Sequence, residues 1–171
     1  MSSHATDPDL CEIFPLFFLV VSDCTKRCFV VVGQTVTICR ADVIFVMDTS
    51  GSIDSSEYQV MKTFVSDVVD QLDVDSGDAR VGAVTFDSNV NTADTILLNE
   101  HTTAAGFQAD ISNLPGTGGF TNTGGALQYV RDVMLTGTNG DRSTAPNAVI
   151  VLTDGRSNAG PDTAVSIKHG T

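Results

Sequence analysis

Three unbroken apolar runs, separated by stretches with helical periodicity, constrain the fold of this chain more than any other feature. The runs occupy residues 43–47, 81–86 and 148–152. Strands that are apolar on both faces are typical of parallel sheets whose two sides are covered by helices. We therefore predict an α/β fold, in which a doubly wound, mostly parallel sheet carries helices on both faces.

The segments between the runs have apolar residues at three-and-four spacing, which predicts amphipathic helices. The first helix is expected over residues 54–74, a second around Phe107 and Leu114, and a third around Leu127 and Met134 with Thr123 as its N-cap. Residues 90–98 follow the second run after a short polar turn, and we predict that they form an antiparallel strand at the edge of the sheet.

The chain of 171 residues is long enough for one domain and an extension. We divide it into an N-terminal segment, residues 1–40, and a domain, residues 41–171. The third run is followed by one short predicted helix, whereas an open doubly wound sheet is expected to continue. We therefore expect an incomplete domain whose last strands are missing.

All four cysteines lie in the N-terminal segment, at Cys11, Cys24, Cys28 and Cys39. Clustered cysteines ahead of a cysteine-free domain favour disulfides in a secreted chain. The spacing of Cys24 and Cys28 supplies half of a zinc site but no second pair, so zinc is the less favoured alternative.

A short apolar run at residues 13–21 precedes most of these cysteines. It is too short to span a bilayer and resembles the core of a secretory signal peptide ending near residue 22. The acidic residues before it have the wrong charge for a signal, and cleavage there leaves three cysteines, an odd number. The alternatives are an apolar strand packed against the domain and a wrongly assigned start of translation.

The net charge limits the partners of this chain. The sequence has 21 acidic and 9 basic residues and a formal charge of −12. This charge repels nucleic-acid phosphates and anionic membranes, so we expect neither nucleic-acid binding nor membrane insertion. A basic partner, or one reached through a bound cation, fits better.

Three polar segments fall where a doubly wound sheet places its binding sites, at the carboxyl ends of the strands. They contain Asp48, Ser50 and Ser52 after the first run, Thr121 in a glycine-rich loop, and Asp154 after the third run. Each segment alone is also typical of a helix cap, a turn or a flexible loop. Their joint occurrence favours one site.

Carboxylate and hydroxyl oxygens without nitrogen or sulfur ligands suit a hard cation. We expect Mg²⁺, with Mn²⁺ or Ca²⁺ as alternatives, and an exchangeable position that accepts a carboxylate from a partner. A helix beginning near Ser52 points its positive end at the site, which opposes the cation weakly and favours an incoming anion.

The segments at residues 41–53, 118–132 and 147–158 resemble the metal-ion-dependent adhesion site of the von Willebrand factor type A family, which includes integrin I domains and matrilins. The resemblance covers residues 41–171. It implies that Ser50, Ser52 and Thr121 are direct metal ligands and that Asp48 and Asp154 act largely through water. It also implies an adhesive, extracellular-matrix function, with a matrix or collagen-like protein that offers Glu or Asp as the partner.

Two features depart from the family pattern. The third run is interior in family members, so here it is expected to expose an unpaired edge that aggregates or pairs with another chain, in a poorly stable domain. Phe120 stands where the family commonly has a small residue, and we interpret it as an anchor of the loop, with a ligand contact as the alternative.

Other function classes remain open in the sequence. A phosphoaspartate hydrolase with Asp48 as nucleophile is disfavoured because Ser50 replaces its second acid and lysines are few. An acidic structural matrix protein that binds Ca²⁺ loosely is a second alternative. His4, His101 and His169 occur in no triad or metal spacing and are expected at the surface, so we predict a binding protein and not an enzyme.

Overall fold

A computed structural model describes residues 17–22 as backbone, and residues 40–155 and 157–161 with their side chains. The strands are β1 (Phe17–Ser22), β2 (Ala41–Asp48), β3 (Ala79–Phe86) and β4 (Asn147–Thr153), and the α-helices are α1 (Ser55–Val69), α2 (Ala104–Asn113) and α3 (Thr123–Tyr129). Short 3-10 helices occupy Thr92–Asp94 and Gly137–Asn139, and a π-helical segment, Val130–Met134, directly follows α3. The cysteines and the helix expected after the third run lie outside the described residues.

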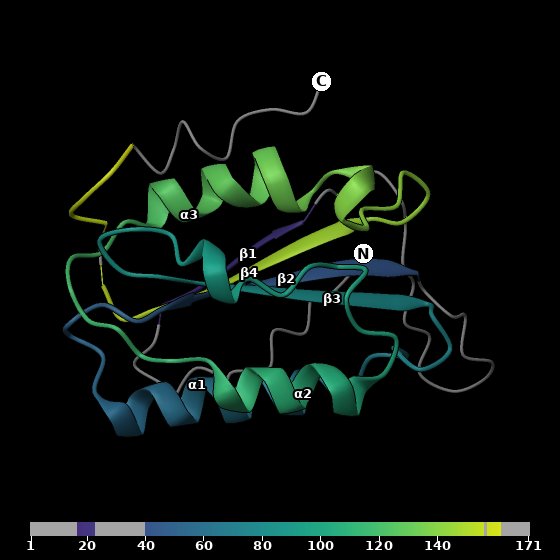
Figure 1. Cartoon of the computed structure of the whole chain (residues 1–171), viewed down its shortest axis with the longest axis horizontal. Helices are drawn as coiled ribbons and strands as arrows, with labels where there is room; N and C mark the ends of the chain where they lie inside the picture. Colours follow the sequence, from purple (N-terminus) through teal and green to yellow (C-terminus); the bar gives the residue numbers. More distant parts are fainter. Residues whose placement is uncertain (1–16, 23–39, 156, 162–171) are drawn as a thin grey trace, which may run out of the picture.

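The sheet has the strand order β1-β4-β2-β3. Strand β2 lies in the centre and pairs in parallel with both β3 and β4. Helices α1 and α2 lie on one face of the sheet and α3 on the other (Figure 1). The predicted α/β fold, with a parallel sheet covered on both sides, is confirmed.

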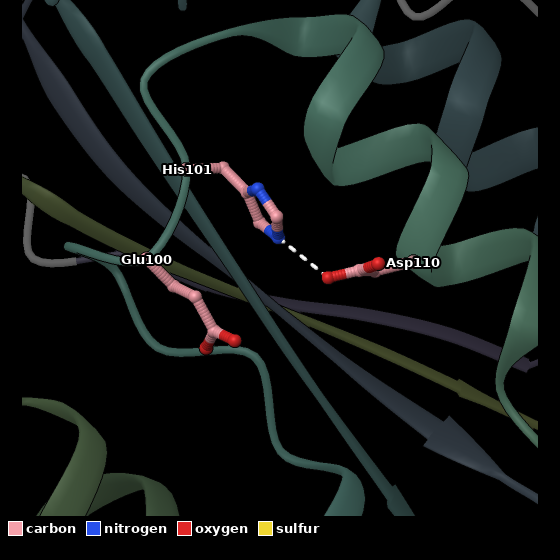
Figure 2. Close-up of side chains that lie close together, drawn as sticks. All are labelled: Glu100, His101 and Asp110. Atoms are coloured by element: carbon pink, nitrogen blue, oxygen red, sulfur yellow. Dashed lines mark hydrogen bonds and ion pairs between the residues drawn. The ribbon is translucent and has the colours of Figure 1, made fainter.

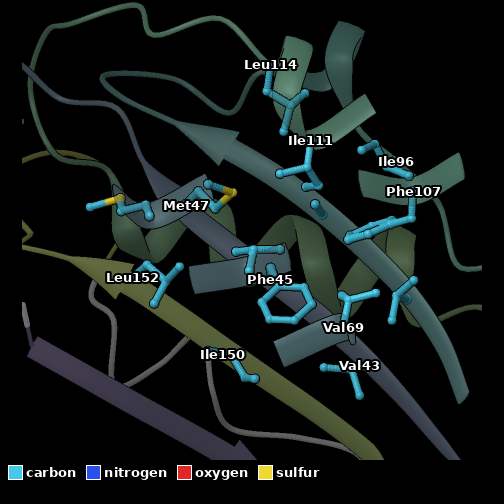
Figure 3. Close-up of a cluster of buried hydrophobic side chains, with 14 of the residues drawn as sticks. Val43, Phe45, Met47, Val69, Ile96, Phe107, Ile111, Leu114, Ile150 and Leu152 are labelled. Carbon is cyan, nitrogen blue, oxygen red and sulfur yellow. The ribbon is translucent and has the colours of Figure 1, made fainter. Parts of the chain in front are cut away.

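Alternate residues of the central strand supply two separate cores. Phe45 and Met47 point into a core with α1 and α2, which is drawn in Figure 3, while Ile44 and Val46 pack against α3. Because both faces are buried, the strand carries no polar residue between Val43 and Met47. The first polar residue after this apolar run is Asp48, at the end of the strand.

Residues 90–98 lie antiparallel to β3, as predicted, but they do not form the predicted continuous strand. This segment makes two isolated antiparallel bridges to β3, from Val90 to Phe86 and from Ile96 to Ala83. A short 3-10 turn, Thr92–Asp94, separates the bridges. The side chain of Asn91 donates a 2.8 Å hydrogen bond to Asp94, and such local side-chain bonds compete with strand pairing.

The edge of β4 is paired, although the sequence predicted that it would be open. Strand β1 runs antiparallel to β4, with Phe17 opposite Thr153 and Ser22 opposite Ala148. This pairing matches the alternative interpretation of the N-terminal apolar run, a strand packed against the domain. The antiparallel edge strand therefore comes from the N-terminal segment and not from residues 90–98.

Helix α1 is shorter than its periodicity predicted, because it ends at Val69 instead of residue 74. The chain after it turns sharply, and the carboxylate of Asp73 accepts a hydrogen bond from the backbone of Ser76. Closely spaced Asp and Ser residues favour such turns over another helical turn.

Candidate metal centre

Asp48 is the last residue of strand β2, at the carboxyl end of the sheet, and its side chain is buried. The backbone N–H of Ser50 donates to one carboxylate oxygen at 2.8 Å, and the hydroxyl of Thr153 donates to the other at 2.6 Å. Burial raises the pKa of Asp48, the hydrogen bonds from Thr153 and Ser50 act in the opposite direction, and the charge of Asp154 raises the pKa further. The charged form is thus fixed in orientation but poorly solvated.

Two serine hydroxyls connect the end of β2 to the segment after β4. The hydroxyl oxygens of Ser50 and Ser52 lie 3.3 Å apart, and Ser52 donates to the carboxylate of Asp154 at 3.0 Å. The alternating spacing of the serines allows both side chains to face the same space, as the sequence predicted. These three side chains and that of Asp48 form one cluster of oxygen-bearing groups.

The glycine-rich loop is fixed against the same segment by backbone hydrogen bonds. Gly118 donates to the carbonyl of Thr49 at 2.7 Å, and Gly51 donates to the carbonyl of Gly119 at 2.9 Å. Gly119 has a φ of 127°, which side-chain-bearing residues rarely adopt. The loop thereby holds Thr121, which is buried, beside the Asp48–Ser52 segment.

All five predicted site residues thus lie on segments that meet at one end of the sheet. Asp48, Ser50, Ser52 and Asp154 are linked through hydrogen bonds of their own side chains or backbones. Thr121 itself bonds to Asn158, and its loop reaches the Asp48–Ser52 segment through Gly118 and Gly119.

Two contributors were missed by the sequence analysis. Thr153 holds Asp48 through its hydroxyl, although the sequence analysis did not include it among the site residues. Asn158 holds Thr121 from both sides: its side chain accepts from the Thr121 N–H at 2.8 Å and its own N–H donates to the Thr121 carbonyl at 2.9 Å. Thr153 could have been found from its position next to Asp154, whereas no sequence signal indicated Asn158.

The predicted cap of α3 is wrong by one residue. Asn122 is the N-cap, and its side chain accepts a hydrogen bond from Gly125 at 2.9 Å. Thr123 is the first residue of the helix, and its buried hydroxyl has no hydrogen-bond partner in the described part of the chain. Native structures rarely leave a buried hydroxyl unpaired, so this one, two residues after Thr121, is open to a further polar group.

The helix that follows the cluster begins at Ser55, later than predicted. Asp54 caps it and accepts hydrogen bonds from the N–H groups of Ser56 and Glu57. The hydrogen bond from the Ser56 hydroxyl, followed by these two backbone bonds, lowers the pKa of Asp54. The first free N–H groups of α1 are therefore used by the helix's own cap, and they are less available to an incoming anion than the sequence suggested.

Phe120 does not anchor the loop with its side chain. Its backbone N–H donates to the hydroxyl of Ser88 at 2.9 Å, yet 66% of the residue is exposed. The loop is fixed by backbone contacts, and the aromatic ring projects into solvent beside Thr121.

Comparisons with known proteins agree with this geometry. The profile of the von Willebrand factor type A domain matches residues 42–169. Matrilin-1 of Mus musculus is 33% identical over 132 residues, covering 73% of this chain and 26% of matrilin-1. Vitrin of Mus musculus is 32% identical over 117 residues, covering 68% of this chain and 18% of vitrin. The collagen alpha-4(VI) chain of Mus musculus is 36% identical over 119 residues, covering 68% of this chain and 5% of that one.

Solved structures show the same similarity. Proximal thread matrix protein 1 from the mussel byssus aligns with a TM-score of 0.70 and 32% identity, covering 75% of this chain and 34% of that chain. Another structure of this mussel protein, described as having a zinc-occupied MIDAS motif, aligns with a TM-score of 0.68 and 31% identity, covering 75% and 34%. The chain spans about a third or less of the length of these relatives.

A mostly parallel sheet with helices on both faces, and with a cluster of oxygen-bearing side chains at the carboxyl ends of its strands, places the chain among the doubly wound α/β domains. Within this class, the chain belongs to the von Willebrand factor type A family, whose profile matches most of it.

Proposed function

We propose that this chain is a divalent-cation-dependent protein-binding module of the extracellular matrix, in which a metal ion bridges to an acidic residue of the partner. The observation that carries the proposal is the cluster of Asp48, Ser50, Ser52 and Asp154, joined by side-chain hydrogen bonds, beside the loop of Thr121. Mg²⁺ is the proposed ion, with Mn²⁺ or Ca²⁺ as alternatives.

The donor set fits a hard cation. Every side chain in the cluster offers oxygen, and neighbouring ligands of an octahedral Mg²⁺ lie about 3 Å apart when its bonds are about 2.1 Å long. The Ser50 and Ser52 oxygens, 3.3 Å apart, are close to that separation. In this proposal Ser50, Ser52 and Thr121 hold the ion directly, and Asp48 and Asp154 hold it through water.

The charge of the cluster supports the same assignment. Burial raises the pKa of Asp48 and the charge of Asp154 adds to the effect, so the ionised Asp48 carboxylate is destabilised without a compensating cation. A bound cation provides that compensation. Because the three direct ligands are neutral, the ion keeps most of its positive charge, which it supplies to a carboxylate of the partner.

The exposed ring of Phe120 extends this surface with an apolar contact. A large exposed aromatic side chain on a fixed backbone loses little conformational freedom on binding and is typical of interface hot spots. We propose that the partner presents an apolar side chain next to its acidic residue. A matrix or collagen-like protein remains the proposed partner, and secretion the proposed localisation.

We propose a binding role for this chain, and not a catalytic one. A phosphoaspartate hydrolase needs a lysine near its nucleophile, and Lys62, the lysine within the described ranges, is instead bound to the Ser112 carbonyl at 3.0 Å and lies over the Tyr58 ring. No helix in the described ranges is long and apolar enough to cross a bilayer.

The test is calorimetric titration of the full chain with Mg²⁺, comparing wild type with Thr121→Ala and, as a matched control, Thr63→Ala on the exposed face of α1. One site per chain, weakened only by Thr121→Ala, is expected. High-capacity Ca²⁺ uptake that survives Asp48→Ala would instead favour the loose acidic matrix protein.

A second experiment tests whether the metal ion bridges to a carboxylate of the partner. A triple-helical peptide containing one Glu per chain is expected to bind the wild type in Mg²⁺ and to dissociate in chelator. The same peptide with Gln in place of Glu is the control. Equal binding of both peptides would rule out bridging through a carboxylate, even where Mg²⁺ itself binds.

A further inference from the structure

A second group of ligand-bearing side chains lies away from the candidate metal centre. Glu100 and His101 sit on the loop before α2, and Asp110 is on α2 itself (Figure 2). One potential ligand atom from each lies within 4.8 Å of the others. Just beyond this loop, the backbone N–H of Ala104 at the start of α2 donates to the carboxylate of Asp75, in the turn that precedes β3. Asp48 of the candidate metal centre is the last residue of β2 and therefore lies at the opposite end of the strands. The two groups share no residue.

The imidazole of His101 is held in place, contrary to the expectation of a simple surface residue. Its Nε2 atom lies 2.8 Å from a carboxylate oxygen of Asp110, and its ring meets Phe107 edge-on at a centroid distance of 6.3 Å. The side chain of His101 is 18% exposed and that of Asp110 is 48% exposed. The nitrogen is thus oriented by packing, while the carboxylate beside it still reaches solvent.

The backbone around the ring leaves it just enough space. A Cβ atom at Gly106 would lie 3.0 Å from His101 Nδ1, which is closer than side chains normally approach. Glycine at this position therefore allows the first turn of α2 to approach the imidazole. On the other side, Glu100 is held by the N–H of Leu97, which donates to its carboxylate at 3.0 Å.

The chemistry of this group differs from that of the oxygen-only centre. One imidazole nitrogen and two carboxylate oxygens suit Zn²⁺, which binds such ligands at about 2.0–2.2 Å and therefore brings them to about 3.4 Å from one another. The Nε2 to Asp110 distance of 2.8 Å therefore has to lengthen by about 0.6 Å, and the exposed Glu100 carboxylate, whose ligand atom lies within 4.8 Å of the other two, has to move inward by at most about 1.5 Å. Water completes the coordination.

We propose that Glu100, His101 and Asp110 form a binding site for Zn²⁺ or a similar transition-metal ion, separate from the adhesion centre. A metal here ties the loop before α2 to the middle of that helix. It replaces the hydrogen bond between His101 and Asp110 with two coordinate bonds. Because the site is independent of the adhesion centre, it stands whether or not the proposed adhesive function holds.

The experiment is a calorimetric Zn²⁺ titration of the full chain in excess Mg²⁺, which competes for the oxygen-only centre. We expect a Zn²⁺ site whose affinity falls at least tenfold in His101→Gln and in Glu100→Gln. Glu100→Gln is the conservative variant, because its amide oxygen still accepts from Leu97. His169→Gln is the matched histidine control, and Thr121→Ala tests independence from the adhesion centre; both are expected to keep this site.

Cobalt provides a second readout. Co²⁺ bound to the wild type is expected to give visible absorption of a nitrogen- and oxygen-ligated ion, which His101→Gln abolishes. Wild-type Zn²⁺ affinity in both His101→Gln and Glu100→Gln would overturn the proposal, and the pair of His101 and Asp110 would then be a structural hydrogen bond alone.

Discussion

The hydroxyl of Ser52 donates a 3.0 Å hydrogen bond to the carboxylate of Asp154, although 102 positions separate the two residues in the chain. The bond exists because β2 and β4 are parallel neighbours, so their carboxyl ends open at the same edge of the sheet. It closes the oxygen-rich cluster from the side of β4.

Replacing Asp154 with Asn is expected to weaken Mg²⁺ binding about 10–100-fold, as is typical of groups that orient metal ligands. Asn keeps an acceptor for Ser52 but loses the charge that attracts the cation. Calorimetric titration measures the change, and Asp132→Asn, which removes an exposed carboxylate on another element, is the control. Unchanged affinity in Asp154→Asn would exclude this carboxylate from the site.

Phe120→Ala is expected to weaken binding of the Glu-containing triple-helical peptide about 5–30-fold, which corresponds to about 1–2 kcal/mol for a contact residue. Its Mg²⁺ affinity is expected to stay unchanged, since the ring is exposed and its backbone is held by Ser88. Val60→Ala, which truncates the other exposed large apolar residue of the described chain, is the control. Peptide binding equal to wild type would leave the ring without a role in recognition.

Gly124→Ala is expected to destabilise the domain by about 1–3 kcal/mol through overpacking. A Cβ atom at this first turn of α3 would collide with the backbone oxygen of Pro161. The collision displaces the segment that includes Asn158, so Mg²⁺ affinity should fall as well. Gly137→Ala is a matched control because nothing lies within 4 Å of its Cβ position. Urea denaturation with and without Mg²⁺ measures both effects.

Arg142→Met is expected to cost about 3–5 kcal/mol of unfolding free energy, the range found when one partner of a buried ion pair is removed. The Arg142 side chain bonds Asp42 at 2.8 Å and also donates to the carbonyls of Ala41, Gly77 and Asp78. Asp42 is fully buried, so its charge would lose its compensation. Arg131→Met, at an exposed pair, should leave the denaturation midpoint almost unchanged.

Removal of residues 1–22 is expected to make the protein self-associate as its concentration rises. Strand β1 pairs with the outer edge of β4, and its loss leaves an apolar strand with free backbone groups. Sedimentation velocity over a range of concentrations measures the effect. A shortened chain that stays monomeric would show that β1 is dispensable for covering the edge, and would fit the interpretation of this segment as a removable signal.

The local patterns in the sequence were sufficient for the fold class and for most of the candidate site. Buried parallel strands must be apolar on both faces, so the runs around Phe45, Val84 and Ile150 identified the sheet. Asp48 and Asp154 were recognisable because they are the first charged residues after two of those runs. The end of helix α1 was less predictable, because its apolar spacing continues to residue 74 although the polar turn around Asp73 stops the helix earlier.

Only the tertiary structure decided which distant groups complete the site and which edge is covered. Asn158 binds Thr121 where two loops meet, and loops have no periodic sequence pattern from which the contact could be predicted. His101 lies beside Asp110 because the chain turns into α2 between them. The pairing of β1 with β4 likewise depends on backbone groups that every residue carries. Side-chain patterns report the face that a residue buries, whereas long-range partners are selected by the geometry of the assembled sheet.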